Sequence, residues 1–416
     1  MSFQYTDKQL NILNQGENVY SVNENYAKRK DFDILTNSES PHVGESNTIE
    51  IDKQEFRVIK VYSDPETGFD GMAVAPIVNG EPDFSSVAVI AAATDIQSVD
   101  TMTAVFGDSD GKKSQGYYLS RQYTPAEEFV QSVLDDPRVH AVTQLSGYSQ
   151  SSYMIKVGAK FGIPTTTFNA WFHYGSLSEE EKEFIKEHPG LFIDYRKNKD
   201  TVVFLNDINH PKNAGYDESL GTIYWTDGTS HDIGDWTFDP ETGRVLDTKT
   251  GKPIIGGPTE AFARSARQML QLKALKAKWE KLGGGLSTNE TLFLDAGQSA
   301  LLGASMAEAA KTGLDELKDL KQEADEAAER LWSGIDFSSY THLARWEVEE
   351  IFASNGVTYE KIVSDFQSYT QEKVKQMEEL SGTFDTLKTT LDSAVEEKLA
   401  LDHQLAGEFR AWKEDL

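Results

Sequence analysis

The stretch "TQLSGYSQSSYMIKVGAKFGIP", residues 143–164, decides which fold and which chemistry the chain can support. An apolar, β-prone run reaches Gly147-Tyr148-Ser149, and a helical pattern starts at once. A strand that turns sharply into a helix holds a serine clear of the backbone, as a nucleophilic hydroxyl requires. Ser151 stands where the common G-x-S-x-G pattern has its second glycine. The motif alone therefore leaves an ordinary polar turn as the alternative.

Length and composition exclude several classes of protein. The 416 residues are enough for about two or three domains. The formal net charge of −28 argues against nucleic acid and against electrostatic docking on anionic lipid. The chain has no cysteine, which excludes disulfides, thiolate metal sites and cysteine nucleophiles.

The N-terminus lacks the pattern of a Sec-type signal peptide. "MSFQYTDKQLNILNQGENVYSV" has no basic region followed by an apolar region. We also find no window of about 18 consecutive apolar residues, so we expect no transmembrane helix. If the protein leaves the cell, we expect another export route.

Residues 51–258 alternate strand and helix signals, and residues 1–50 form a helical or irregular segment that leads into them. Continuous apolar strands separated by helices predict an α/β domain with a mostly parallel sheet covered on both faces. A helix is predicted at 124–136, with Thr124 as N-cap and Glu127 completing a capping box. Residues 237–258 suggest a Gly/Pro-rich hairpin at the exit from the domain. The expected strands are 55–63, 86–94, 139–146, 164–170 and 201–206.

Residues 259–416 predict an all-α, elongated helical-hairpin domain. All 12 prolines lie at or before Pro258, and proline is a strong helix breaker. Helices are expected from about 259 to 282, where "GGG" interrupts the pattern, and then to about 332. Apolar residues from Ile362 to Trp412 recur every three or four positions, which predicts one long helix of about 80 Å, with a kink or break possible at Gly382. The apolar stripe along this helix can pack against another helix of the same chain in antiparallel orientation, against separate helical partners, or against both.

A family resemblance becomes visible around the opening stretch. "VTQLSGYSQSSYMIKVGAKFGIPTTTFNAWF" resembles the elbow region of class 3-type lipases, which have the α/β-hydrolase fold. "SVAVIAAATD" is similar to the strand that ends in R-G-T in those enzymes and supplies an oxyanion donor. Matching by position puts Thr94 on that threonine and Ala93 on its glycine. The Gln150 N–H, at a helix N-terminus, would be the other donor.

The resemblance implies a triad in the order serine, acid, histidine. Ser149 would be the nucleophile, and His231, in "DGTSHDIGDW", the general base and then acid. Asp207, which ends "TVVFLND", would orient and stabilise the imidazolium. It suits equally the cap of a turn, because Asn and Asp favour turns.

Other residues compete for these roles. Asp194 is the rival acid, although "LFIDYRK" around it is itself expected to be a strand, and His210 is the rival base. The alternative for His231 is an ordinary loop histidine, and His173 either lines the pocket or faces solvent. The Asp-rich "HDIGDWTFDPETG" segment matches no EF-hand spacing, so we expect no metal and no cofactor.

The arrangement of enzyme first and helices last resembles the lipase toxins of the bacterial type VII secretion system, in a reversed LXG-like order. That resemblance implies secretion without a Sec signal, small helical WXG-like partner proteins on the C-terminal domain, and an immunity protein. The function expected is a secreted lipase that cleaves lipid acyl esters through an acyl-enzyme. The alternatives are a soluble short-chain esterase or thioesterase, and a catalytically inactive helical scaffold.

Overall fold

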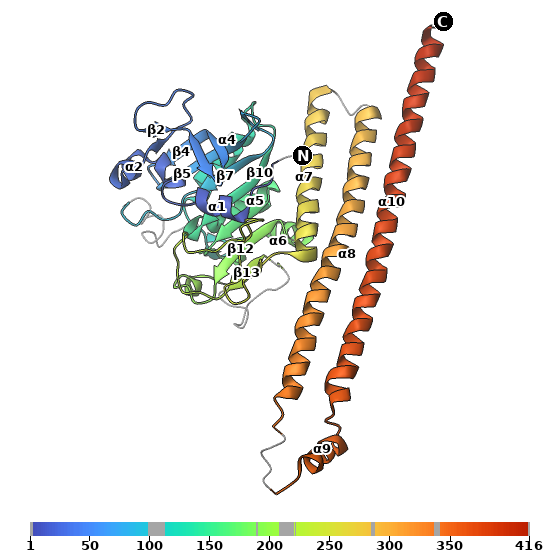
Figure 1. Cartoon of the computed structure of the whole chain (residues 1–416). Coiled ribbons are helices and arrows are strands. Elements are labelled where there is room, and N and C mark those ends of the chain that lie inside the picture. Colours follow the sequence, from blue (N-terminus) through green and yellow to red (C-terminus); the bar gives the residue numbers. More distant parts are fainter. Residues whose placement is uncertain are drawn as a thin grey trace. The chain divides into compact units, whose positions relative to one another are not determined.

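The computed structural model describes residues 3–98, 113–188, 190–207, 220, 222–283, 288–336 and 342–414. The chain forms two compact units (Figure 1). The first comprises Met1–Ile255 and Ala266–Ala277, and the second Gly256–Ser265 and Lys278–Leu416. The chain first passes from one unit to the other at Ile255, close to the boundary expected at residue 258. The middle of helix α7 (Gly257–Gly283) nevertheless belongs to the first unit.

Among the described residues of the first unit, nine strands form one mixed sheet (Figure 1). Its parallel part confirms the α/β class. The parallel strands lie in the order β7 (Val87–Ala91), β10 (Val142–Tyr148), β11 (Thr165–Phe168), β12 (Phe192–Lys197) and β13 (Ile223–Thr226). Beyond β7 the sheet continues with antiparallel β5 (Phe69–Val78), β4 (Gln54–Asp64) and β3 (Thr48–Ile51), and β6 (Glu81–Pro82) pairs with β5. Two short pairs stand apart: β1 (Ile34–Leu35) with β2 (Glu45–Ser46), and β8 (Lys113–Ser114) with β9 (Tyr117–Tyr118).

The strand expected at 201–206 is wrong. Val203–Leu205 form a 3₁₀ turn, η4, and Phe204 is 71% exposed. The strand of this region is β12, all six residues of which are buried. The Thr-Val-Val run has high β-propensity, but propensity is a weak guide where burial and pairing go to another segment.

Helices cover both faces of the sheet. On one face, α4 (Tyr123–Leu134), α5 (Met154–Phe161) and α6 (Glu179–Glu187) share a core with Val87 and Val89. Alternate strand residues point to the other face, where Ala88 and Ile90 meet α1 (Asp7–Leu13), η1 (Val19–Val22) and the segment after β13. A short helix, α2 (Glu24–Lys30), follows η1. Residues 1–50 are therefore more than a lead-in, because they form part of one covering layer.

Two local expectations need correction. Helix α4 begins at Tyr123, and Gln122 before it makes no side-chain cap, so Thr124 lies inside the first turn rather than at the N-cap. The segment 237–258 contains two isolated bridges, Phe238–Val245 and Leu246–Pro253, in place of one regular hairpin. Each bridge closes an Asp-x-x-Thr-Gly turn that ends on a glycine with positive φ, where a residue without Cβ is favoured.

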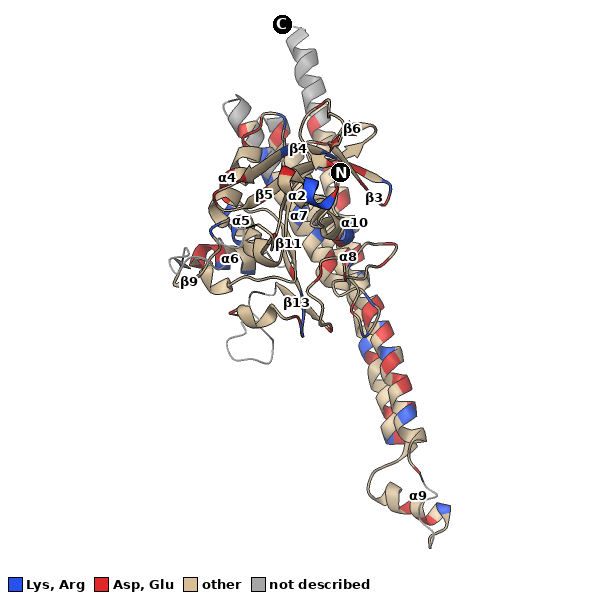
Figure 2. Ribbon diagram, turned by 90° about the vertical axis from the view of Figure 1, so that its left-hand side faces the viewer, with Lys and Arg blue, Asp and Glu red and all other residues tan. Residues whose placement is uncertain are grey.

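The second unit is helical, as predicted. Its long elements are α8 (Thr288–Ser333) and α10 (Asp365–Glu414), which pack against each other in opposite directions. The chain between them contains α9 (Arg345–Ser354) and a π-helical turn, η6 (Glu360–Ser364). Helix α10 continues through Gly382 without a break. Figure 2 shows acidic and basic residues interspersed along both helices.

The contact between α8 and α10 accounts for part of the predicted stripe. Val363 and Val374 are buried. Leu391 packs on Gly303 of α8, where an added Cβ would lie 3.2 Å from the leucine side chain. An ion pair of 3.1 Å joins Lys318 to Glu378 across the two helices. Antiparallel packing within the chain is thus present. No helix within the described residues is long and apolar enough to span a bilayer.

Gly158 allows α5 to pack closely against the sheet, and this predicts a large effect of one methyl group. A Cβ there would lie 2.0 Å from Thr165 Oγ1 and 2.7 Å from the Ile163 carbonyl oxygen. Gly158→Ala should therefore destabilise the first unit by about 1–3 kcal/mol through overpacking. Thermal unfolding followed by circular dichroism measures the change.

Gly382→Ala is the matched control, because nothing lies within 4 Å of its added Cβ. It is expected to be neutral, or to stabilise α10 by up to about 1 kcal/mol. Equal unfolding temperatures for the two variants would show that the contact at Gly158 relaxes without cost.

Candidate active site

The candidate site lies at the carboxyl ends of the five parallel strands. Thr94 follows β7, Ser149 follows β10, Asn169 follows β11, Asp200 follows β12 and His231 follows β13. Because neighbouring parallel strands end at the same edge of a sheet, residues far apart in sequence meet there. This edge is where open α/β sheets generally bind ligands.

The turn after β10 has the strained geometry of a nucleophile elbow. Ser149 has a φ of 52°, in the left-handed region, and it begins the 3₁₀ turn η2 (Ser149–Tyr153) that leads into α5. Gly147 makes this turn possible, because a Cβ there would lie 2.3 Å from the Ser151 carbonyl oxygen. The turn is thus not an ordinary polar connection.

Ser151, the departure from the G-x-S-x-G pattern, stabilises the elbow. Its hydroxyl accepts a hydrogen bond from the Tyr148 N–H at 2.7 Å and donates to the Tyr148 carbonyl at 2.9 Å. The side chain is fully buried, so both polar partners are satisfied without water. A serine at this position therefore fits the turn.

Three side chains form a hydrogen-bonded chain at the elbow. His231 Nε2 lies 2.9 Å from Ser149 Oγ, and His231 Nδ1 lies 2.8 and 3.0 Å from the two carboxylate oxygens of Asp200. An ionised carboxylate only accepts, so Nδ1 carries the proton and Nε2 accepts from the serine hydroxyl. This arrangement can take the proton of Ser149 during attack on an electrophilic carbon.

The acid beside His231 is Asp200, so the expectation of Asp207 is wrong. Asp200 lies three residues past the end of β12 and is only 5% exposed. The sequence points to Asp207 because the β-branched run at 201–206 resembles the strand that precedes the acid. With β12 as the true strand, the first aspartate beyond it is the one that reaches the histidine.

Asp207 instead anchors the loop after β11. Its carboxylate accepts the backbone N–H groups of Tyr174, at 3.0 Å, and Gly175, at 2.7 Å. The neighbouring Asn206 accepts from the Phe172 N–H at 2.7 Å and donates to the Ala170 carbonyl at 3.0 Å. The alternative reading of Asp207, as the cap of a turn, is closer to this role.

The rival candidates also lie elsewhere. Asp194 is fully buried in β12 and paired with Arg196 at 2.7 Å, so it belongs to the core. His173 Nε2 lies 2.8 Å from the Leu205 carbonyl oxygen, within the same anchored loop. His210 lies outside the described residues.

Asn169 is a site residue that the sequence analysis did not single out. Its amide donates to Asp200 Oδ2 at 2.6 Å and to the Ser230 carbonyl at 3.2 Å, and it accepts from Trp236 Nε1 at 2.7 Å. Asn169 also has a positive φ of 46°, which asparagine tolerates better than most residues. The signal in the sequence is the position of Asn169, directly after the β-prone run at 164–168 and therefore at the strand ends where the site lies.

The environment of Asp200 keeps it ionised. Burial by itself would raise the pKa of Asp200, but the hydrogen bonds from His231, from the Val202 N–H and from Asn169 outweigh it and hold the pKa below the usual range. An ionised carboxylate can only accept, so Asp200 holds the Nδ1–H of His231 in place.

Tyr148, inside the elbow motif, holds the histidine loop. Its hydroxyl donates to the His231 carbonyl at 2.6 Å, and the two rings lie 5.3 Å apart. The residue before the serine thus fixes the backbone of the histidine, which links the two segments that must meet.

The two expected oxyanion residues are in contact with each other. Thr94 Oγ1 donates to Gln150 Oε1 at 2.9 Å, and Gln150 Nε2 donates to Ser120 Oγ at 2.6 Å. Gln150 immediately follows Ser149 and is 1% exposed, so its side chain joins the elbow to the loops after β7 and before α4. Ala93, at the position of the family's glycine, is buried beside them.

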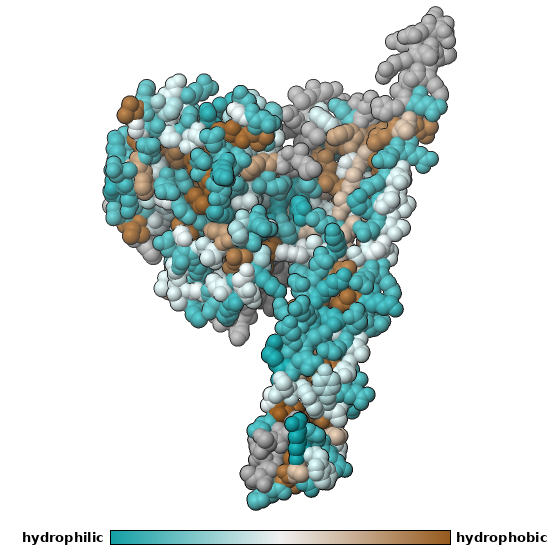
Figure 3. All heavy atoms as spheres, viewed as in Figure 1, coloured by the Kyte–Doolittle hydropathy of each residue, from teal (hydrophilic) through white to brown (hydrophobic). Residues whose placement is uncertain are grey.

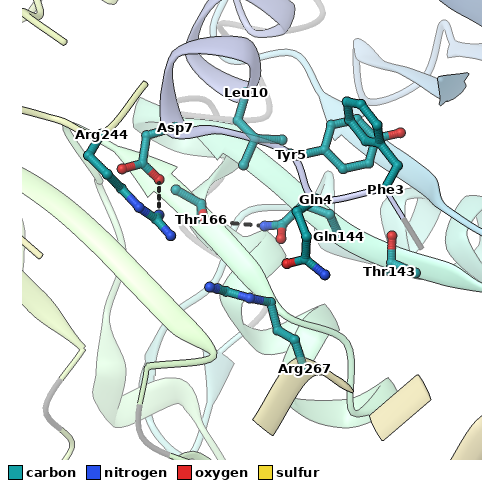
Figure 4. A pocket seen from close by; sticks show the side chains of 10 residues that line it. All are labelled: Phe3, Gln4, Tyr5, Asp7, Leu10, Thr143, Gln144, Thr166, Arg244 and Arg267. Carbon is teal, nitrogen blue, oxygen red and sulfur yellow. Dashed lines mark hydrogen bonds and ion pairs between the residues drawn. The ribbon is translucent and has the colours of Figure 1, made fainter. Parts of the chain in front are cut away.

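A small cavity lies away from this site. It has a volume of about 20 Å³, room for about one water molecule, and the Asp7–Arg244 ion pair is on its wall (Figure 4). Thr143 and Gln144 line it from the start of β10, whereas Ser149 follows the end of that strand. The cavity is too small for an organic substrate.

We find no match to this chain among family models, curated proteins or solved structures. Interpretation of the site therefore depends on its geometry and on the resemblance in the sequence motifs.

Replacing the two candidate acids separates their roles. Asp200→Asn should lower the turnover of an ester substrate by about 10⁴, because the amide leaves His231 in the wrong tautomer and removes the charge that stabilises the imidazolium. Initial rates with p-nitrophenyl butyrate measure the loss.

Asp207→Asn is the matched control, and it should reduce turnover by less than about tenfold, because it weakens only the loop anchor. A large loss with Asp207→Asn and a small loss with Asp200→Asn would contradict the assignment.

Proposed function

We propose that the protein is a serine ester hydrolase of the α/β-hydrolase class that cleaves lipid acyl esters. The observation that carries the proposal is the hydrogen-bonded chain from Ser149 through His231 to Asp200, on a serine with a φ of 52°. A positive φ at a non-glycine residue is costly, and such strain concentrates at functional sites. Turn residues such as Asp52 and Asn79 also have positive φ, so the hydrogen bond from Ser149 to His231 is what sets this turn apart.

In the proposed reaction, Ser149 Oγ attacks the ester carbonyl carbon while its proton passes to His231 Nε2. Backbone N–H groups of Gln150 and of Thr94, in the loop after β7, stabilise the oxyanion. The bond to the alcohol then breaks, and His231 returns the proton to the departing oxygen. Water repeats the sequence on the acyl-enzyme: it gives a proton to His231, releases the acid and restores Ser149.

Two experiments test this activity. A fluorophosphonate probe should label the wild-type protein and fail to label Ser149→Ala, because only an activated serine attacks the probe. Intact-mass spectrometry and gel fluorescence give the readout. An unlabelled wild-type protein would favour a catalytically inactive scaffold.

The second experiment compares esters of short acids with emulsified long-chain esters. We expect hydrolysis of both. Activity confined to short chains would identify a soluble esterase or thioesterase instead.

We further propose that the helical unit serves type VII-like export and binds small helical, WXG-like partner proteins, with an immunity protein opposing the enzyme. Support comes from a stripe of exposed apolar side chains along α10. Its members are at least one-third exposed: Phe366, Leu380, Leu387 and Leu401. They are separated by 14, 7 and 14 residues, a heptad spacing that suits the seam of another helix. Figure 3 shows hydrophobic patches interrupting the hydrophilic surface of this unit.

A double substitution tests the stripe. Leu380→Glu with Leu387→Glu should abolish binding of a helical partner, because it places charges in an apolar seam, and should leave ester hydrolysis within about twofold. Co-purification with proteins encoded beside this chain measures binding, and p-nitrophenyl butyrate measures activity.

The control is Thr389→Glu, which adds a charge to an exposed position about 200° around the same helix from Leu387. It should keep the partner. Loss of binding in the control alone, or in neither variant, would argue against the stripe.

A further inference from the structure

Two aromatic residues, one before the elbow in the sequence and one after it, lie on segments that hydrogen-bond to the elbow. The Trp171 N–H donates to the Ser149 carbonyl at 3.0 Å. Tyr118 lies two residues before Ser120, whose hydroxyl accepts from the Gln150 side chain at 2.6 Å. The backbone of each aromatic residue is therefore connected, directly or within two residues, to the Ser149–Gln150 pair.

The two rings stack on each other. Their centroids are 5.3 Å apart and their planes differ by only 7°. Both residues remain partly exposed. Burial raises the pKa of Tyr118 to about 12, with a smaller opposing contribution from Ser120, so its ring carries no charge at neutral pH. The pair thus offers an uncharged surface, made of the ring edges and the outer faces of the stack, within a few residues of the candidate nucleophile.

The segments that carry the rings are fixed to each other. Ser114 Oγ donates to the Ser176 carbonyl at 2.6 Å, and the Tyr117 ring packs so closely on Gly175 that a Cβ there would lie 2.5 Å from it. Asn206 and Asp207 anchor the same loop from its other side, through the four backbone hydrogen bonds described above. A rigid aromatic surface loses little entropy when a chain binds on it.

Resting on the proposed ester hydrolysis at Ser149, we propose that the Tyr118–Trp171 stack is the surface on which the acyl chain of the substrate lies. It favours unbranched acyl chains of medium or greater length, whose methylenes cover the two rings. Acetyl and propionyl esters are too short to reach across it. The loop held by Asp207 thus sets specificity, while Asp200 serves the reaction itself.

The test compares acyl-chain preference in variants of the stack. We expect Trp171→Ala and Tyr118→Ala each to lower the ratio of kcat/KM for p-nitrophenyl octanoate to that for p-nitrophenyl acetate by about tenfold or more, because methylene contacts are lost. Trp171→Phe, which keeps a stacking ring, should retain most of the ratio. Tyr62→Ala is the aromatic control: Tyr62 is 40% exposed on β4 and packs on Phe129. Its ratio should not change.

An unchanged ratio in both alanine variants, with the fold intact by circular dichroism, overturns the acyl surface. Labelling by the fluorophosphonate probe separates this result from a failure of the proposed function. Variants that label at Ser149 but keep the wild-type ratio reject only the acyl surface. A wild-type protein that neither labels nor hydrolyses any ester rejects the hydrolase and the acyl surface together.

Discussion

The candidate site depends on the backbone of one residue, Ser149, held at positive φ between β10 and α5. Two close contacts maintain this conformation. The hydrogen of Gly147 faces the Ser151 carbonyl, where a methyl group has no space, and the Ser151 hydroxyl bonds to both backbone groups of Tyr148. The strain of about 1–3 kcal/mol at such a residue is tolerable only when the surrounding packing opposes relaxation. Gly158 contributes to that packing by letting α5 lie directly on β11.

The positive φ matters because it aims Ser149 at residues from three other strands. His231 arrives after β13, Asp200 after β12 and Asn169 after β11, and hydrogen bonds connect them in series. Each connection also has a backbone anchor: Tyr148 holds the His231 carbonyl, and Asn169 holds the Ser230 carbonyl. The parallel sheet brings the ends of these strands close together, and short polar side chains bridge the remaining distance between them. Small changes in strand register would therefore affect the whole chain of contacts.

The sequence predicted the central part of this arrangement and missed its acid, for a physical reason. The elbow could be recognised because a buried strand, small residues and a helix follow one another within about twenty positions. The histidine could be recognised by its order in the chain.

The acid depended on knowing which strand precedes it. The strand at 192–197 is expected from its sequence, but a second strand expected at 201–206 moves the predicted acid to the end of that later run. The β-branched run at 201–206 looked more like a strand, yet tertiary packing placed it in a 3₁₀ turn at the surface. In the helical unit the three-and-four periodicity predicts the helices but not which apolar side chains are buried. Val374 is buried whereas Leu380 is exposed, and only the packed structure distinguishes them.

Asp207 shows why an acid in nearly the expected place need not be the one that contacts the histidine. Both carboxylates accept two or more hydrogen bonds, but from different kinds of donor. Asp200 accepts a hydrogen bond from the imidazole N–H of His231. The imidazole would become positively charged in the proposed reaction, and an ionised Asp200 would stabilise that charge. Asp207 receives backbone N–H groups, whose charge never changes, so it can only hold a loop in place. That loop carries Trp171, whose N–H bonds to the Ser149 carbonyl. The two aspartates thus have different roles near Ser149: Asp200 would stabilise a charge on His231, and Asp207 fixes the conformation of the neighbouring loop.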